Sequence, residues 1–265
     1  MSELNTVALC VQYDGRDYSG WQIQLSPALP TVQGELQKAL SFIANHEVKV
    51  VCAGRTDSGV HGSYQVVSFQ TSAVRPLKAW VQGVNTQLSK SVSVLWAHPV
   101  PDEFHARFSA FERRYHYFIR NHTARSALTA GRMTHQPRKL DADKMHRAAQ
   151  ALLGENDFSA FRGAGCQGNT PFRNVTHIDV ARFGDVVRID ISANAFLLHM
   201  VRNITGSLMD VGMGLQPEEW MAELLAGKDR NLAGITAPPD GLYLVGVSYP
   251  DKFGLPKPEP LTVIA

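Results

Sequence analysis

The sequence predicts an α+β fold made of two ferredoxin-like halves whose strands form a mixed central sheet. Short runs rich in β-branched and aromatic residues alternate with segments of helical periodicity along the chain. Their order in the first half, residues 1–104, is β-α-β-β-α-β, and the second half, residues 105–265, repeats it. With 265 residues, 44% of them hydrophobic and 19% charged, the chain is long enough for two globular cores. We therefore expect an N-terminal and a C-terminal α+β subdomain.

Each element of the first half has a local signal. Residues 7–12 predict a strand, and Thr31 can cap a helix whose apolar residues continue at helical spacing to Ile43. Residues 48–52 and 64–69 predict two further strands. Pro76 suits the first turn of a second helix that continues to Leu88, and residues 92–97 predict the closing strand.

The second half gives similar signals. Residues 111–120 predict a long strand, and Asp141 can cap a helix that Gly154 ends. Residues 175–180 and 186–191 flank a short turn at residues 182–185 and predict a hairpin. Residues 196–211 and 217–226 predict two more helices, and residues 242–249 predict the last strand.

The loop between the strands at 48–52 and 64–69 is the strongest candidate for a catalytic site. It carries Arg55, Asp57 and His61 around Gly54 and Gly59, and these glycines allow tight turns and close approach of a ligand. Loops at strand ends are where folds often present chemistry. On spacing alone, an Asx-type turn closing a hairpin, with the arginine and the aspartate as a surface ion pair, is an equal alternative.

The charge distribution points to a polyanionic partner. Residues 105–147 hold ten Lys or Arg and three acids, which is +7, so the rest of a chain of net charge +2 carries −5. Such segregation favours nucleic acid as the partner, although a solvated basic face is the simpler alternative. Within this region Phe104-His105-Ala106-Arg107-Phe108 alternates rings with cations, which suits RNA because bases stack on aromatic and guanidinium planes. The same pentapeptide could be a linker whose two phenylalanines anchor in the core.

Three further places could contribute to a site. Tyr115 lies in the predicted strand 111–120 and could project towards a site, or be an ordinary half-buried sheet tyrosine. Arg202 lies in an apolar helix and needs a partner, which could be Asp57 or a purely structural acid. Residues 163–168 match the dinucleotide-binding string but lack its strand and helix, so they predict a flexible loop whose Gly165 and Gln167 could approach a phosphate backbone.

Several classes of protein are disfavoured. Cys10, Cys52 and Cys166 are widely separated, and no histidine or cysteine motif has metal-ligand spacing, so no metal site is expected. No apolar run approaches the ~20 residues that span a bilayer. The first residues lack the features of a signal peptide, so we expect a cytoplasmic protein without membrane association. A hydrolase with a Gly-x-Ser-x-Gly elbow is also disfavoured.

The loop at residues 54–61, Gly-Arg-Thr-Asp-Ser-Gly-Val-His, resembles the signature loop of the tRNA pseudouridine synthase A (TruA) family. Other blocks resemble that family in the same order. These are Tyr13-Asp14-Gly15, Tyr18-Ser19-Gly20-Trp21-Gln22, Phe104-His105-Ala106-Arg107-Phe108, Arg114-Tyr115-His116-Tyr117, Asn156-Asp157-Phe158 and His199-Met200-Val201-Arg202-Asn203. The resemblance covers the chain nearly end to end, and only residues 121–138 look less like the family.

The resemblance implies an enzyme that isomerises uridine to pseudouridine at positions 38 to 40 of the tRNA anticodon stem-loop. It implies a homodimer, a central cleft between the two halves, and no cofactor or metal. By motif, Asp57 would be the nucleophile, and Arg55 would fill the place of the flipped-out base. Tyr115 would stack on the uracil, and Arg202 would pair with Asp57. Further tRNA contacts are expected at Arg75, at residues 104–108 (Phe104, His105, Ala106, Arg107 and Phe108), and at Gly165 and Gln167.

The residues are chemically suited to this reaction. Exchanging a C–N for a C–C glycosidic bond requires detaching the uracil and turning it, and a carboxylate can assist by attacking either the ring or the sugar carbon. The base that removes the C5 proton could be Tyr115 or Asp57. The competing interpretation is a non-catalytic RNA-binding module, because ferredoxin-like halves also resemble RNA-recognition folds.

Overall fold

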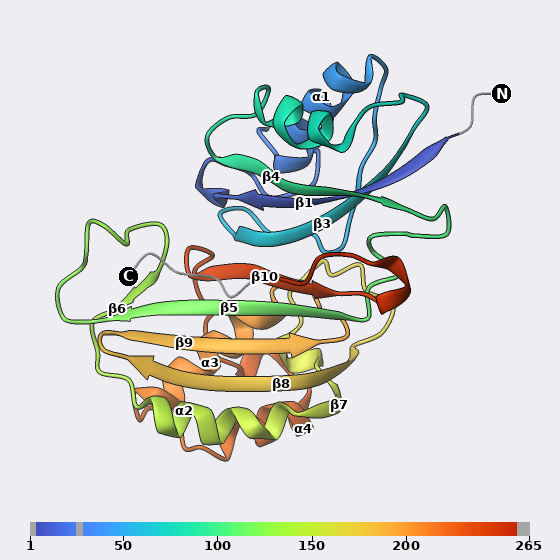
Figure 1. Ribbon diagram of the computed structural model, residues 1–265. Coiled ribbons are helices and arrows are strands. Elements are labelled where there is room, and N and C mark those ends of the chain that lie inside the picture. The colour runs from blue at the N-terminus through green and yellow to red at the C-terminus, as the bar shows by residue number, and fades with distance from the viewer. Residues whose placement is uncertain (1–3, 25–28, 259–265) are drawn as a thin grey trace. The chain divides into compact units, whose positions relative to one another are not determined.

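The computed structural model describes residues 4–24 and 29–258, which form two compact units (Figure 1). Unit 1 consists of the described residues of Met1–Phe111 and Leu244–Ala265, and unit 2 is Glu112–Tyr243. This division differs from the predicted one between residues 104 and 105, because residues 105–111 and most of the last strand belong to the first unit. Both units contain helices and strands, which confirms the α+β class. The cleft between two ferredoxin-like halves stays a prediction.

The strands of unit 1 surround β1 (Asn5–Tyr13), which is antiparallel to both β3 (His61–Thr71) and β4 (Val92–Val100). On the other side of β3 lie the short β2 (Val51–Cys52) and β10 (Leu242–Ser248). The predicted strand at 48–52 is therefore paired only over its last two residues, although Val48 and Val50 are buried. The order of elements along residues 1–111 is the predicted β-α-β-β-α-β.

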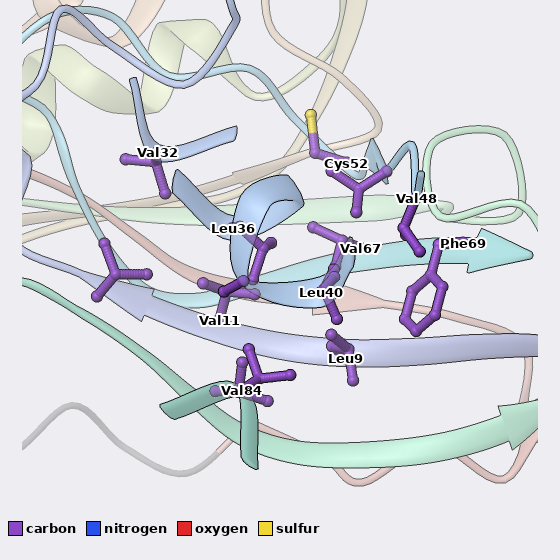
Figure 2. Close-up of a cluster of buried hydrophobic side chains, with 14 of the residues drawn as sticks. Leu9, Val11, Val32, Leu36, Leu40, Val48, Cys52, Val67, Phe69 and Val84 are labelled. Carbon is purple, nitrogen blue, oxygen red and sulfur yellow. The ribbon is translucent and has the colours of Figure 1, made fainter. Parts of the chain in front are cut away.

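A helix and a helical turn cover the apolar side of these strands. In α1 (Val32–Ala44), the Thr31 hydroxyl oxygen accepts a hydrogen bond from the Gly34 amide at 3.2 Å, so the predicted N-cap is confirmed. Figure 2 shows Leu40 of this helix pointing at Leu9 of β1 and Leu36 pointing at Val11 of the same strand. The second helix, predicted from Pro76 to Leu88, forms over residues 77–85 and is wound as a π-helix at Ala79–Gly83.

In unit 2 the strands lie in the order β5 (Glu112–Asn121), β9 (Val186–Ala193), β8 (Phe172–Phe183) and β7 (Gly154–Asp157), each antiparallel to the next. A short β6 (Thr134–Gln136) runs parallel to the end of β5, so the pairing in this unit is mixed. The predicted β8–β9 hairpin is confirmed. The sequence analysis missed β6 and β7, which are only three and four residues long.

The helices of unit 2 are α2 (Ala142–Ala149), α3 (Met200–Gly212) and α4 (Trp220–Gly227); they pack against one another, and α2 packs on β8. Asp141 caps α2 by accepting a hydrogen bond from the Lys144 amide at 3.0 Å, as predicted. The last two helices begin later than predicted, because His199 precedes α3 in the left-handed region and residues 217–219 form only a turn. Within residues 4–24 and 29–258, none of the helices has the length and apolarity needed to cross a membrane. Short 3-10 turns occupy Gly15–Asp17, Gln150–Leu152, Ser159–Phe161, Arg230–Leu232 and Asp251–Phe253.

A buried carboxylate, Asp190 of β9, lies close to one arginine and two histidine side chains of neighbouring strands. Arg114 of β5 donates from Nε to Oδ1 at 2.8 Å and from Nη2 to Oδ2 at 2.5 Å. His116 Nε2 lies 3.4 Å and His177 Nε2 lies 3.8 Å from the same Oδ2. Burial alone would raise the pKa of Asp190, but the hydrogen bonds from Arg114 and His116 outweigh it and hold the pKa well below its usual range.

We expect Asp190→Asn to lower the free energy of unfolding by about 2 kcal/mol at neutral pH, because Arg114 loses a charged partner. A carboxyl whose folded pKa lies below its unfolded pKa stabilises the fold above the unfolded pKa, and the stabilisation is lost as pH falls towards the folded pKa. The difference between wild type and variant in urea unfolding should therefore shrink between about pH 5 and pH 2.

The surface carboxylate Asp185, 2.9 Å from Arg120 Nη1 and half exposed, provides the control. Asp185→Asn is expected to cost less than about 1 kcal/mol, because solvent screens the pair. A difference for Asp190→Asn that stayed constant down to about pH 2 would contradict the role of its charge.

Candidate active site

The loop from Ala53 to Val60 connects the end of β2 to the start of β3 within unit 1. Its first residues are tied to β3: the Ala53 amide donates to the Val66 carbonyl at 2.8 Å, and the side chain of Gln65 binds both the N–H and the C=O of Gly54. At its far end, the Val60 amide donates to the Asp57 carbonyl at 3.2 Å across Gly59, whose φ is +78°. The loop is therefore a defined turn with Asp57 at its head.

A second segment, residues 13–21, supports the middle of this loop. The Tyr13 hydroxyl lies 2.9 Å from the Thr56 hydroxyl oxygen in the protein interior, and the Trp21 amide donates to the Thr56 carbonyl at 3.0 Å. The Tyr18 carbonyl accepts from the Ser58 hydroxyl at 3.2 Å. Thr56 is buried, so its hydrogen bonds hold it in one place.

A glycine lets this support approach closely. Gly20 has a φ of +93°, and a Cβ built on it would lie 2.9 Å from the Thr56 carbonyl oxygen and 3.1 Å from the Asp57 carbonyl carbon. Only a residue without a side chain fits there without moving the loop. Sequence reasoning assigned no role to Tyr13, Gly20 or Gln65, although residues 13–15 and 18–22 were among the family-like blocks.

The two functional residues predicted on the loop differ in exposure. Arg55 is exposed, and Asp57 is partly buried. Cys52, which precedes the loop, is buried, and burial raises the pKa of its thiol to about 12. The Cys52 thiol is therefore neutral at physiological pH and a poor nucleophile.

Tyr115 lies in β5 of unit 2, opposite Ile191 of β9, and is buried. Its ring meets that of Phe196 edge-on, with centroids 5.0 Å apart. An aromatic contact of this kind restricts the plane of the tyrosine ring. Phe196 belongs to the loop between β9 and α3. Tyr115 therefore contacts the segment that leads into the helix of Arg202.

Arg202 lies in the first turn of α3, partly exposed, and is held to a segment that follows α4. Its Nε donates to the Ala237 carbonyl at 2.8 Å, and the Ala237 amide donates to the Arg202 carbonyl at 3.1 Å. Neighbouring Asn203 binds Arg230 Nη2 at 3.0 Å and Thr236 Oγ1 at 2.7 Å, which ties the segment to α3 a second time. The pairing of Arg202 with Asp57 stays a prediction.

The glycine loop at 163–168 is hydrogen-bonded to Leu198, which lies just before α3. The Gly163 amide donates to the Leu198 carbonyl at 2.8 Å, and the Leu198 amide donates to Cys166 Sγ at 3.4 Å. The loop follows a 3-10 turn and precedes β8, so it lacks the elements of a dinucleotide site, as predicted. Gly165, with a φ of +78° and open space around its Cα, and the exposed Gln167 form its outer edge.

The pentapeptide at 104–108 divides into buried and exposed residues. The Phe104 ring is buried against Tyr249 and Phe253, with centroids 5.1 and 5.0 Å away. Ala106 is also buried, and its amide donates to the Ser68 hydroxyl oxygen at 3.1 Å. These two residues anchor the segment and do not present side chains at the surface.

The other three residues form a stack at the surface, in which Arg107 and Phe108 are exposed and His105 is partly buried. His105 and Phe108 have ring centroids 4.3 Å apart, and Phe108 is 77% exposed. The guanidinium of Arg107 lies 5.6 Å from the centre of the Phe108 ring. His105 Nδ1 accepts hydrogen bonds from the amides of Arg107 and Phe108, both at 3.2 Å, and so holds the stack together.

The remaining cations are partly committed to other groups. Arg75 is exposed, and its Nε donates to the Ile43 carbonyl at 3.2 Å. Within the basic region 105–147, three arginines pair with acids outside it: Arg114 with Asp190, Arg120 with Asp185, and Arg147 with Glu218. The excess of +7 is thus reduced locally. In the described part of the chain no three His, Cys, Asp or Glu side chains gather as a metal site would require.

A family model and two relatives agree on the family of this chain. A family model described as tRNA pseudouridine synthase matches residues 9–109 and 148–250. Proteins of Salmonella paratyphi B and Salmonella newport, both named tRNA pseudouridine synthase A, are 56% identical to this chain over 257 residues, which is 97% of this chain and 94% of each relative. A solved structure, an H/ACA RNP bound to a substrate RNA containing 2'-deoxyuridine, covers 77% of this chain and 44% of its own with 14% identity and a TM-score of 0.38, too little similarity to bear on function.

These matches define the class of protein as an RNA-modifying isomerase, one that forms pseudouridine in tRNA. More narrowly, the chain belongs to the tRNA pseudouridine synthase A (TruA) family, as its motifs indicated. The alternative of a non-catalytic RNA-binding module is therefore wrong. The unmatched residues 110–147 include the region 121–138 that looked least like the family.

Proposed function

We propose that this enzyme converts uridine to pseudouridine at positions 38, 39 and 40 of the tRNA anticodon stem-loop, with Asp57 as the nucleophile. The observation that carries the proposal is the loop of residues 53–60, in which hydrogen bonds to Gly54 and Thr56 hold the chain on both sides of Arg55 and present Asp57 at the head of a turn. A nucleophile gains most when its carboxylate is held in place before the substrate arrives.

The proposed reaction begins when the target nucleotide leaves its stack, which costs a few kcal/mol and is assisted by Arg55 in the opened strand. The Asp57 carboxylate then attacks either the uracil ring or the ribose carbon, and the C–N bond breaks. The uracil turns, its C5 forms the new C–C bond to the ribose carbon, and the bond that Asp57 had made breaks, which gives back the free carboxylate. The C5 proton is removed by Tyr115 or by Asp57, and N1 takes up a proton. Arg202 stabilises the carboxylate, and no cofactor or metal takes part.

Release of tritium from [5-³H]uridine tRNA tests which uridine positions of the tRNA are modified. Four substrates are needed: three that each keep a single uridine, at position 38, 39 or 40, and a fourth with cytidine at all three. Release from each of the first three and none from the fourth supports the proposal. Release from the fourth substrate would mean that the enzyme acts at another site of the tRNA.

The surface stack of His105, Arg107 and Phe108 is proposed to contact the tRNA backbone and an unpaired base, together with Arg75, Gly165 and Gln167. Arg107→Ala should weaken tRNA binding and reduce the slope of log K against log salt by about one contact. Lys49→Ala serves as the control, because Lys49 is an exposed lysine 3.5 Å from Glu47. The measurement is the dissociation constant at several salt concentrations. An unchanged slope for Arg107→Ala would remove this residue from the interface.

We further propose that the enzyme works as a homodimer. A tRNA is large compared with one 29.2 kDa chain, so two chains can share its stem and loop. Sedimentation at working concentration should show a species of twice the chain mass. A monomer with full activity would contradict the proposal.

A further inference from the structure

Gln65 is a buried polar residue whose side chain makes two hydrogen bonds to one glycine, Gly54. It lies in β3, and its exposed fraction is 0%. Its Nε2 donates to the Gly54 carbonyl at 2.5 Å, and its Oε1 accepts from the Gly54 amide at 3.3 Å. A buried amide group needs both kinds of partner, and here one glycine supplies both.

Where the loop begins, the hydrogen bonds between Gln65 and Gly54 take the place of the main-chain hydrogen bonds between β2 and β3. Val51 and Cys52 of β2 pair with Ser68 and Val67 of β3, and the Ala53 amide continues the pairing at the Val66 carbonyl. At Gly54 the partner changes from the main chain of β3 to the side chain of Gln65. A carboxamide carries the same donor and acceptor as a peptide group, so the chain can turn out of the sheet with its polar groups satisfied.

The pair of hydrogen bonds between Gln65 and Gly54, called the Gln65 clamp below, fixes the position of the main chain just before Arg55. Arg55 follows Gly54 directly, and Thr56 is fixed by the Tyr13 hydroxyl at 2.9 Å and the Trp21 amide at 3.0 Å. Arg55 therefore lies between two held residues, and Asp57 follows the second. If Gly54 were displaced, the main chain before Arg55 would shift, while Thr56 would stay in place.

We propose that Gln65 is a positioning residue for pseudouridine formation: it holds Gly54 so that Arg55 and Asp57 meet the uridine in reacting geometry. The inference rests on the proposed function of the Asp57 loop. Gln65 does not touch the substrate in this proposal. Its loss should therefore lower turnover more than it lowers tRNA affinity, because affinity comes mainly from phosphate contacts elsewhere.

Asn85 offers a control within unit 1 that matches Gln65 in its hydrogen bonds, although Asn85 is exposed and Gln65 is buried. Its side chain clamps the main chain of Val94 in the same way, with Nδ2 donating to the carbonyl at 2.9 Å and Oδ1 accepting from the amide at 2.7 Å. Val94 lies in β4, which carries none of the proposed site residues. Removing the side-chain hydrogen bonds of Asn85 therefore measures the effect of such a loss on stability, separately from any effect on the proposed site.

The experiment compares Gln65→Leu, Gln65→Glu, Asn85→Leu and Asp57→Asn. For each, kcat and KM for tritium release, the dissociation constant for tRNA, the melting temperature and hydrogen exchange at the Gly54 amide are measured. We expect both Gln65 variants to lower kcat about 10- to 100-fold, since a displacement near 1 Å can cost that much. KM and the dissociation constant should change less than about threefold, and Gly54 exchange should quicken. Asn85→Leu should lower the melting temperature without changing kcat.

Gln65→Glu keeps the length of the side chain and the acceptor for the Gly54 amide but loses the donor, so it carries the test if Gln65→Leu does not fold. A kcat within about twofold of wild type in the folded Gln65 variants would overturn the inference. So would an equal loss of kcat in Asn85→Leu, because the effect would then be general. Retained turnover in Asp57→Asn would instead overturn the proposed function, and the two failures are thus distinguishable.

Discussion

Asp57→Asn should abolish tritium release, with a loss of at least about four orders of magnitude in turnover. The substitution keeps the size and polarity of the side chain but removes its charge and most of its nucleophilicity. The neighbouring Cys52 cannot replace it, because burial raises the pKa of that thiol to about 12. The variant should fold and bind tRNA normally, because affinity depends mainly on phosphate contacts.

Melting temperature, tRNA affinity and tritium release on one preparation separate a catalytic from a structural role. Asp17→Asn is the control, since Asp17 is an exposed carboxylate of the same unit in the turn Gly15–Asp17. It should leave all three quantities unchanged. If Asp57 only supported the fold, its loss would lower stability and binding together, and residual activity would follow the folded fraction. Substantial release from Asp57→Asn would place the chemistry elsewhere.

Gly20→Ala is expected to produce the second large effect, a fall in kcat of about 100-fold. The new methyl group would lie 2.9 Å from the Thr56 carbonyl oxygen and 3.1 Å from both the Asp57 carbonyl carbon and the Ser58 nitrogen. All three are main-chain atoms, so the loop must move to make room. The φ of +93° adds strain of about 1–2 kcal/mol for any residue with a Cβ.

Gly154→Ala separates the strain from the contact. Gly154 has a similar φ of +87°, and nothing lies within 4 Å of a Cβ built on it. Both variants should lose similar stability from the backbone, but only Gly20→Ala should lose turnover per folded molecule. Thermal unfolding and single-turnover tritium release measure the two effects. Equal activity in the two variants would contradict the view that residue 20 shapes the Asp57 loop.

Elements with local causes were predictable from the residues alone. Thr31 and Asp141 cap their helices because each bonds to an amide three residues later, a relation that the sequence contains. The β8–β9 hairpin also depends on neighbours in the chain. The α+β class follows from the order of these elements, and Asp57 and Arg55 stood out because a loop with those residues follows an apolar strand.

Elements that need a distant partner were predicted less well. Only two residues of the expected strand 48–52 pair, because pairing depends on where β3 lies rather than on the apolar run. The strands β6 and β7 are too short to show a pattern and exist through their pairing with β5 and β8. The π-helical winding at Ala79–Gly83 has no sequence signal that we recognise.

The motifs, with their order along the chain, were enough to indicate the family and a candidate nucleophile, because chemistry depends on residue type. Two phenylalanines of one pentapeptide show what tertiary structure alone decided: Phe104 is buried against Tyr249, whereas Phe108 is 77% exposed. Likewise, only the folded chain brings Tyr13 to Thr56, 43 residues away. Burial and hydrogen-bond partners arise from contacts between distant segments, and no local pattern encodes them.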